Sequence, residues 1–272
     1  MKARVAGRRG QPLLQSYYDV ARLLRKGAVY STTSTWVFRV SPLVGLATAV
    51  SALLLIPFGG AAAALAFPGD LFLFAYLLAL GRFLTILGAL DTGSSFEGMG
   101  ASREATFGAL AEPALLLALA AVAREAGSGS LTGFIHPLWS ESGITAALAL
   151  GTLGVVFLAE NARMPVDDPN THLELTMIHE VMVLDHGGPD LAFIHYASAL
   201  KLWLFGALLV GLAVPQPAGW GGFALAGLGM LAVAVGTGLV ESFFARLRMD
   251  AVPQFLLSGS ALAAIALLLG LR

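Results

Sequence analysis

Carboxylates and histidines gather in one polar segment of the chain, residues 160–190, whose sequence is ENARMPVDDPNTHLELTMIHEVMVLDHGGPD. The segment holds one basic residue, Arg163, and a larger set of acidic residues: Glu160, Asp167, Asp168, Glu174, Glu180, Asp185 and Asp190. Clustered carboxylates raise one another's pKa when they leave water, so they can bind and release protons near neutral pH. Histidine suits such a relay and recurs every seven residues, at His172, His179 and His186. The segment is therefore predicted to exchange protons; the alternative is a solvated acidic loop.

A metal site is less favoured by the same residues. Pro165 and Pro169 interrupt the chain, and the pattern from Thr171 onward predicts a short helix that ends at Gly187 and Gly188. The three histidines then lie roughly on one helix face, too far apart to converge easily on one tetrahedral ion. The histidine–glutamate pair in the middle also lacks the second histidine of the HExxH zinc motif.

Three ionisable residues fall inside apolar runs of the sequence: Arg82, Glu112 and Lys201. A charged side chain in a membrane span costs about 2.5–3.5 kcal/mol on insertion scales, so it usually faces the interior of a helix bundle and marks a pathway. Pro113, which follows Glu112, removes a helix hydrogen bond beside that carboxylate. Two structural alternatives stay open: Arg82 and Glu112 pair to lock two helices, or Lys201 extends to the membrane surface.

A second polar stretch, LDTGSSFEGMGASREATFGALAEP, carries Asp91, Glu97, Arg103 and Glu104 among small residues. Glu104 lies eight residues before Glu112, which places the two carboxylates nearly on one helix face. They are predicted to form successive steps of a path into the membrane. The alternative is a surface turn whose charges are satisfied by solvent and neighbours.

The elements that position these residues are membrane helices. Of the 272 residues, 57% are hydrophobic and only 12% are charged, against about 25% charged in a soluble domain. Seven apolar runs are each long enough to cross a bilayer, which takes about 20 helical residues. The runs cover residues 40–58, 71–90, 107–123, 143–159, 191–214, 219–240 and 253–271. The prediction is an all-α, polytopic transmembrane bundle that forms a single membrane domain over residues 1–272.

The basic residues predict the orientation of the bundle. Residues 1–39 hold half of the lysines and arginines of the chain, and such residues are enriched in cytoplasmic segments. The N-terminus and the 160–190 loop are therefore both predicted to be cytoplasmic. Within the first segment, residues 15–26 predict a basic amphipathic helix at the membrane interface; a solvated basic loop is the alternative.

Cysteine is absent from the sequence, which excludes disulfides, thiolate metal sites and directly ligated iron–sulfur clusters in this chain. Phosphate loops, nucleophile elbows and dinucleotide fingerprints are also absent. We therefore predict that the subunit binds no redox cofactor or metal. The lipid bilayer is an expected partner, and nucleic acid is not.

Two long runs carry a resemblance to a known family: LDTGSSFEGMGASREATFGALAEPALLLAL and ENARMPVDDPNTHLELTMIHEVMVLDHGGPDLAFIHYASALKLWLF. They resemble the hydrogenase-4 component C and formate hydrogenlyase subunit 4 family, which is homologous to subunit 1 of respiratory complex I. In the complex I branch the second motif resembles E-x-N-R-x-P-x-D followed by E-x-E-x-E-L. Glu160, Arg163, Pro165, Asp167 and Glu174 occupy the matching positions. Members of the family usually have eight spans, so the first span of the family pattern is expected to be missing from this sequence.

The resemblance implies a membrane anchor beneath a nickel–iron hydrogenase-like arm, with a NiFe centre and iron–sulfur clusters in the partner subunits. It implies hydrogenase-like large and small subunits and antiporter-like membrane subunits as partners. Together with the analysis of the residues, it predicts a proton path through Asp91, Glu97, Glu104, Glu112, Glu160, Asp167, Asp168, Glu174, Glu180, Asp185 and Lys201. Structural or partner contacts are expected for Arg82, Arg103, Arg163, His172 and His179.

Three functions follow from this sequence. The first is a proton-path and anchor subunit of a group 4 hydrogenase or formate hydrogenlyase-like complex in the cell inner membrane. The second is a quinone-chamber subunit of a complex I-like NADH dehydrogenase. The third, a free-standing secondary transporter, is less favoured, because the sequence lacks the paired broken helices of an inverted repeat.

Overall fold

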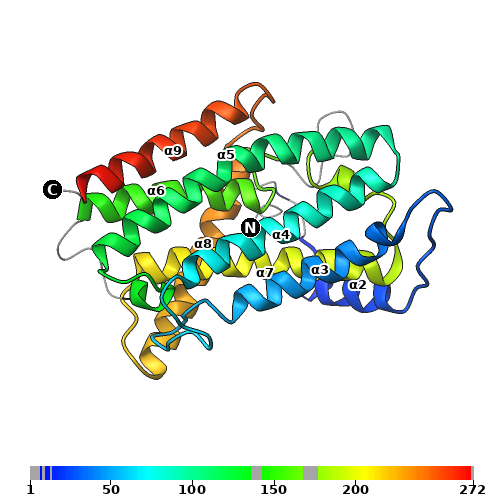
Figure 1. Ribbon diagram of the computed structural model, residues 1–272. Coiled ribbons are helices and arrows are strands. Elements are labelled where there is room, and N and C mark those ends of the chain that lie inside the picture. Colours follow the sequence, from blue (N-terminus) through cyan, green and yellow to red (C-terminus); the bar gives the residue numbers. More distant parts are fainter. Residues whose placement is uncertain (1–6, 8–9, 13, 136–142, 168–176, 271–272) are drawn as a thin grey trace.

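The computed structural model describes residues 7, 10–12, 14–135, 143–167 and 177–270 (Figure 1). Every regular element in these ranges is a helix, as the apolar runs predict. Seven of the helices are long and apolar enough to cross a membrane. They are α3 (Trp36–Leu53), α4 (Asp70–Asp91), α5 (Ser95–Glu125), α6 (Gly143–Glu160), α7 (Gly188–Ala213), α8 (Trp220–Phe243) and α9 (Val252–Leu269). Each predicted run corresponds to one of these helices, so the prediction of a seven-span bundle is confirmed.

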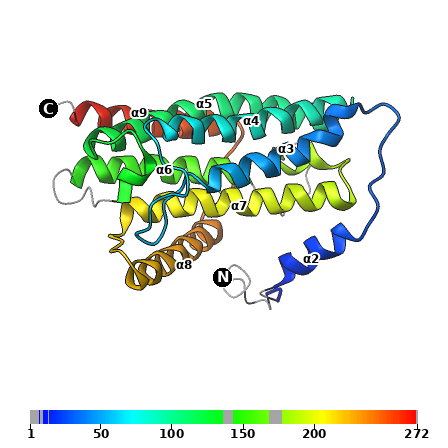
Figure 2. The same cartoon turned by 60° about the horizontal axis from the view of Figure 1, so that its bottom comes forward.

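Helices α3 to α7 and α9 lie side by side as a bundle, and α8 is inclined to them at its edge (Figures 1 and 2). Aromatic and aliphatic side chains fill the bundle core, among them Phe74 of α4, Leu119 of α5 and Phe205 of α7. By contrast, most of α8 is exposed. Its apolar surface is that of a helix in contact with lipid or with another membrane subunit.

Helix α5 begins at Ser95, well before the run predicted to start at residue 107. The early turns pack tightly: Glu97, Gly100 and Glu104 are all buried. A Cβ atom at Gly100 would clash with the side chains of Val181 and Met182. The predicted boundary is wrong because polar and small residues extend the helix where they meet a folded loop rather than lipid.

The loop between α6 and α7 differs from the predicted short helix. Residues 168–176, with Asp168, His172 and Glu174, lie outside the described residues. From residue 177 onward the described chain forms only a short 3-10 helix, η3 (Glu180–Val183). The prediction of a helix up to Gly187 is therefore wrong over residues 177–187. Asp167 in the same loop and Glu97 of α5 accept backbone hydrogen bonds of this loop, which replace those of a regular helix.

The predicted amphipathic segment contains helix α2 (Gln15–Leu24), which confirms that it is helical. Its whole length is described, and none of its residues is buried. It packs against α7 at the edge of the bundle (Figure 2). Tyr17, Tyr18 and Leu24 are exposed. Attachment to a lipid surface stays a prediction.

At the end of the bundle away from the loop between α6 and α7, two polar side chains hold connecting loops in place. Asp70, at the start of α4, is fully buried and accepts hydrogen bonds from Ser130 Oγ at 2.6 Å and from the Leu131 amide at 2.8 Å. Gln216, after α7, accepts through Oε1 from the Gly59 amide at 2.7 Å. We call Asp70 and Gln216 the far-end clamps, because each ties a connecting loop to the bundle.

Candidate functional site

Arg82 contacts three carboxylates of neighbouring helices. Arg82 lies near the middle of α4 with only 8% of its side chain exposed. Its guanidinium Nε is 3.2 Å from Glu104 Oε1, and its Nη1 donates to Glu112 Oε1 at 2.7 Å. Its Nη2 donates to Glu160 at the end of α6. Three carboxylates from two other helices thus share one cation that cannot lose its proton.

The sequence of α5 makes room for this arrangement. Glu104, Gly108 and Glu112 are spaced by four residues and therefore lie on one helix face. A Cβ atom at Gly108 would lie 2.6 Å from Arg82 Nη1, so a larger residue would displace the guanidinium. Glycine at this position lets Arg82 reach both carboxylates of α5.

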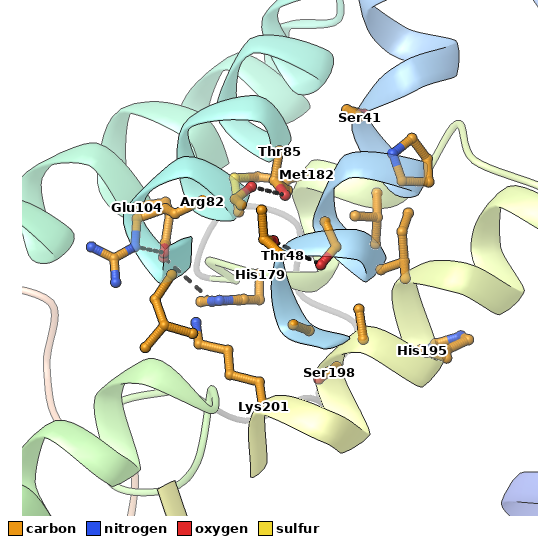
Figure 3. A pocket seen from close by; sticks show the side chains of 18 of the residues that line it. Ser41, Thr48, Arg82, Thr85, Glu104, His179, Met182, His195, Ser198 and Lys201 are labelled. Carbon is orange, nitrogen blue, oxygen red and sulfur yellow. Dashed lines mark hydrogen bonds and ion pairs between the residues drawn. The ribbon is translucent and has the colours of Figure 1, made fainter. Parts of the chain in front are cut away.

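Two further side chains complete the site. Lys201 Nζ of α7 lies 2.7 Å from Glu160 Oε2. His179 Nδ1 lies 3.4 Å from Glu104 Oε2 (Figure 3). We refer to the set of six residues as the Arg82 cluster: Arg82, Glu104, Glu112, Glu160, His179 and Lys201. The pairing of Arg82 with Glu112, which the sequence left open, is observed. Lys201 turns to Glu160, so the alternative in which it extends to the membrane surface is wrong.

The charges of the Arg82 cluster do not cancel. With its three carboxylates ionised, with Arg82 and Lys201 charged and with His179 neutral, the cluster carries one net negative charge. A single proton bound to His179 or to one carboxylate would neutralise it. Buried sites favour a balanced charge, so the cluster is suited to hold one exchangeable proton.

A cavity of about 160 Å³ opens beside the Arg82 cluster, between α3, α4, α7 and the loop after α6 (Figure 3). Glu180 and His186 of the loop and His195 and Ser198 of α7 are among the residues that line it. A second cavity of about 20 Å³ lies between α5 and α6, and its lining includes Glu104, Glu160, Asp167 and His179. That is enough space for one water molecule, which needs about 10–15 Å³. Polar groups and water-sized space therefore adjoin the cluster on two sides.

Five described acidic residues predicted on the proton path lie outside the Arg82 cluster, and three of them, Asp91, Glu97 and Asp185, lie beyond its cavities. Asp91 accepts hydrogen bonds from Thr35 and Phe38, at the start of α3. Glu97 is buried and accepts from the amide of the exposed Asp185 at 3.1 Å. The structure gives Asp91 and Glu97 contacts that hold segments together, and a role in proton transfer stays a prediction for all three.

Asp167 and two predicted partner-contact arginines lie around the same loop. Asp167 is 2% exposed and pairs with Arg246 at 2.9 Å. Arg103 Nη1 donates to the Met177 carbonyl at 2.9 Å, and Arg163 Nη1 donates to Glu241 at 3.3 Å. These contacts tie α5, α8 and the residues after α8 to the loop.

Sequence reasoning missed Glu241, Arg246 and His195. Arg246 and Glu241 both follow the predicted run 219–240, where charged residues are expected at the end of a span. His195 lies inside a predicted run, so the rule that selected Lys201 also applies to it. Asp70 was missed because it precedes its apolar run and resembles a loop residue.

His186 lines the cavity, and Tyr30 lies near it, with its ring 6.4 Å from that of Phe38. The His186 ring stacks on Phe38 with ring centroids 3.9 Å apart. Burial lowers the pKa of His186, against the opposing charges of Asp190 and Asp185. Burial and a hydrogen bond with Asp190 raise the pKa of Tyr30. Both groups are therefore held in their neutral forms near neutral pH.

The described residues hold no group of three or more histidine, aspartate or glutamate side chains that could bind a metal ion. The absence of a cofactor from this subunit stays a prediction.

Comparison with known proteins places the chain in a family. The family model for NADH dehydrogenase matches residues 1–271. The chain is 31% identical to formate hydrogenlyase subunit 4 of Escherichia coli (strain K12), over 97% of this chain and 89% of that protein. It is 35% identical to hydrogenase-4 component C of the same organism, over 79% of this chain and 68% of that protein.

A solved structure has the same fold. It is a chain of the membrane-bound sulfane sulfur reductase, an archaeal respiratory membrane complex, with a TM-score of 0.83 and 20% sequence identity. The match covers 98% of this chain and 90% of that chain. The resemblance stated from the two motifs is therefore confirmed, and the chain belongs to the NADH dehydrogenase family of multi-pass membrane subunits, with formate hydrogenlyase subunit 4 and hydrogenase-4 component C among its relatives.

Proposed function

We propose that this protein is the membrane anchor and proton-path subunit of a group 4 [NiFe] hydrogenase or formate hydrogenlyase-like complex. The observation that carries the proposal is the Arg82 cluster, in which three membrane carboxylates share two cations beside a cavity. The names of the two curated relatives support the hydrogenase-type complex over other members of the family.

Protons enter, in this proposal, from the loop after α6 and move along α5. His179 and Glu180 receive them at the cavity, Glu104 takes them from His179, and Glu112 releases them on the far side of Arg82. Arg82 itself transfers no proton, because a guanidinium stays charged in proteins. It stabilises ionised carboxylates, so a proton that arrives on Glu104 weakens one ion pair and is passed on rather than kept.

The position of Glu112 supports a membrane partner. Its side chain is 44% exposed on α5, inside a membrane span. A carboxylate exposed to lipid is costly, so a neighbouring subunit with polar side chains is the favourable environment for it. We assign this neighbour to the antiporter-like subunits. The hydrogenase-like large and small subunits, with their NiFe centre and iron–sulfur clusters, would bind at the end that carries α2 and the loop after α6.

The same assignment orients the protein in the cell inner membrane with the N-terminus and the 160–190 loop in the cytoplasm. A reagent that labels a cysteine introduced at Asn170 only from the cytoplasmic side supports it. Labelling from the periplasmic side alone contradicts it.

The cavity favours one alternative, a quinone-chamber subunit of a complex I-like NADH dehydrogenase. Its volume of about 160 Å³ is enough for one aromatic ring, and its lining of apolar and polar residues from α3 and α7 would suit a flat, partly polar one. Quinone reduction by the purified complex, blocked by a bulky side chain at Gly45 or Ala49 in the lining, would favour this alternative.

The test of proton transfer is Glu104→Gln in the complex that contains this subunit, reconstituted into vesicles. Glutamine keeps the shape of glutamate but holds no exchangeable proton. Redox-driven proton movement should fall about a hundredfold, the scale of a lost acid–base group. Asp250→Asn is the matched control, because Asp250 is 67% exposed and pairs with the exposed Arg248. Full proton movement in Glu104→Gln would reject the proposal.

A further inference from the structure

The segment after α8 is bound to the segment after α6 at two points. The Leu247 amide donates to the Pro165 carbonyl at 2.8 Å. One residue earlier, Arg246 Nη2 lies 2.9 Å from Asp167 Oδ1. Arg246 is 17% exposed and Asp167 is 2% exposed, so this ion pair is shielded from water and salt, unlike a surface pair.

Asp167 uses its other oxygen to hold the loop. Oδ2 accepts hydrogen bonds from the backbone amides of Ile178 and His179, each at 3.2 Å. The carboxylate therefore joins Arg246 on one side to the His179 backbone on the other. A rotation of the carboxylate, which the ion pair with Arg246 resists, would move the amide that carries His179.

The His179 side chain depends on this placement. Its Nδ1 lies 3.4 Å from Glu104 Oε2, an ion-pair distance that is slightly longer than a hydrogen bond. A shift of a few tenths of an ångström toward Glu104 would allow proton transfer, and an equal shift away from it would weaken the pair. Asp167, His179 and Glu104 also line the same small cavity. The space between them therefore leaves room for the His179 side chain to shift.

We infer that Arg246 is a positioning residue that acts through Asp167 to hold His179 within reach of Glu104. Its effect on proton movement rests on the proposed function; its effect on the loop does not. Arg246 then sets the entry step of the proton path, although it lies outside the spans and the 160–190 loop.

A double-mutant cycle tests the inference in the reconstituted complex. The variants are Arg246→Gln, His179→Gln and the two combined, with Arg248→Gln as the matched control because Arg248 is 86% exposed. Arg246→Gln should lower redox-driven proton movement about tenfold, the scale of a misplaced transfer group. In the His179→Gln background the same substitution should add almost nothing, because residues that act through one another are not additive. Arg246→Lys should restore most of the movement, and Arg248→Gln should match the wild type.

Two results would overturn the inference. One is proton movement in Arg246→Gln equal to that of Arg248→Gln. The other is an additive cycle, in which Arg246→Gln weakens His179→Gln as much as it weakens the wild type; this would indicate a general loss of structure. If Arg246→Gln fails to accumulate in the complex, Asp167→Asn replaces it in the same cycle, since asparagine keeps an oxygen for the two amides but loses the charge that attracts Arg246.

The proposed function and the positioning role of Arg246 are rejected by different results. Should Glu104→Gln conduct normally, proton transfer through the Arg82 cluster is rejected whatever the cycle gives. Should Glu104→Gln abolish proton movement while the cycle is additive, the proton path stands and only the positioning role of Arg246 is rejected.

Discussion

The two ends of the bundle bury polar side chains in opposite ways. At the far end, Asp70 and Gln216 accept hydrogen bonds from uncharged donors, mostly backbone amides of one loop each. In the Arg82 cluster, carboxylates of α5 and α6 share the cations of α4 and α7 and face two cavities. Both regions satisfy buried groups, but with partners of different kinds.

The difference distinguishes polar groups that stabilise a loop from polar groups that can exchange a proton. An acceptor matched to fixed amide donors has one good arrangement, so it stabilises a loop and gains nothing from a proton. Carboxylates that compete for shared cations have several arrangements of similar charge balance, and a proton changes which one is favoured. The far-end clamps are therefore expected to affect stability alone, and the Arg82 cluster to affect proton transfer.

The largest expected effect comes from Arg82→Gln, which removes the shared cation. Three carboxylates would then lie close together with Lys201 as the remaining cation of the cluster. Breaking a buried ion pair on one side costs about 3–5 kcal/mol. We expect little of the subunit to copurify with its complex, and faster unfolding in detergent. Recovery comparable to that of Arg248→Gln would mean that the cluster contributes little to folding.

Glu112→Gln comes second and separates function from folding. Glutamine can still accept from Arg82, and the side chain is 44% exposed, so assembly should be retained. Coupled proton movement should fall about a hundredfold, because the group can no longer bind an exchangeable proton. Vesicle assays with equal amounts of assembled complex measure this. Intact assembly with unchanged pumping would reject a conducting role for Glu112, and loss of assembly would make it a helix lock for Arg82.

Asp70→Asn is expected to show the reverse pattern. Asparagine keeps one acceptor oxygen but presents an NH₂ group to one of the two donors, the Ser130 hydroxyl or the Leu131 amide. A buried group left unsatisfied costs about 1–3 kcal/mol. The thermal midpoint of the complex should fall, while proton movement per assembled complex stays at the wild-type level. A conduction defect at unchanged stability would break the distinction between the two ends.

The sequence predicted the spans well because hydrophobic runs depend on the bilayer rather than on neighbours. Length and composition alone located seven helices and identified Arg82, Glu112 and Lys201 as charged residues inside spans. The start of α5 and the loop from residue 177 could not be predicted in this way, since both depend on contacts between Gly100 and Val181 that only the packed bundle creates.

The membership of the Arg82 cluster was predictable only in part. Glu104 and Glu112 share a face by their spacing, but spacing within one helix cannot show that Arg82 of α4 lies opposite Gly108. The role of Arg246 was not predictable at all, because it depends on a contact between loops 79 residues apart in sequence (167 to 246). Pairings of this kind follow from how helices pack.

The smallest expected effect concerns His186, which shares features of both kinds of group. It lines the cavity beside the Arg82 cluster, but its ring is stacked on Phe38, as expected of a structural side chain. Its pKa is lowered by burial, while Asp190 and Asp185 oppose that shift. A neutral histidine in this packing should behave as a structural group whose protonation is unfavourable.

The sign of the resulting pH dependence follows from linkage. Above about pH 6.5, the ordinary pKa of histidine, His186 is neutral in both the folded and the unfolded chain and costs nothing. Below that pH the unfolded chain binds a proton that the folded protein binds only at its lower pKa, so stability falls as the pH falls through this window. The thermal midpoint of the complex should therefore drop more between about pH 7.5 and about pH 5.5 in the wild type than in His186→Gln. His195→Gln, on the exposed side of the same cavity, is the matched control and should keep the wild-type slope. Equal slopes in His186→Gln and the wild type would show that His186 takes up its proton without cost, and the residue would then belong with the exchanging groups of the Arg82 cluster.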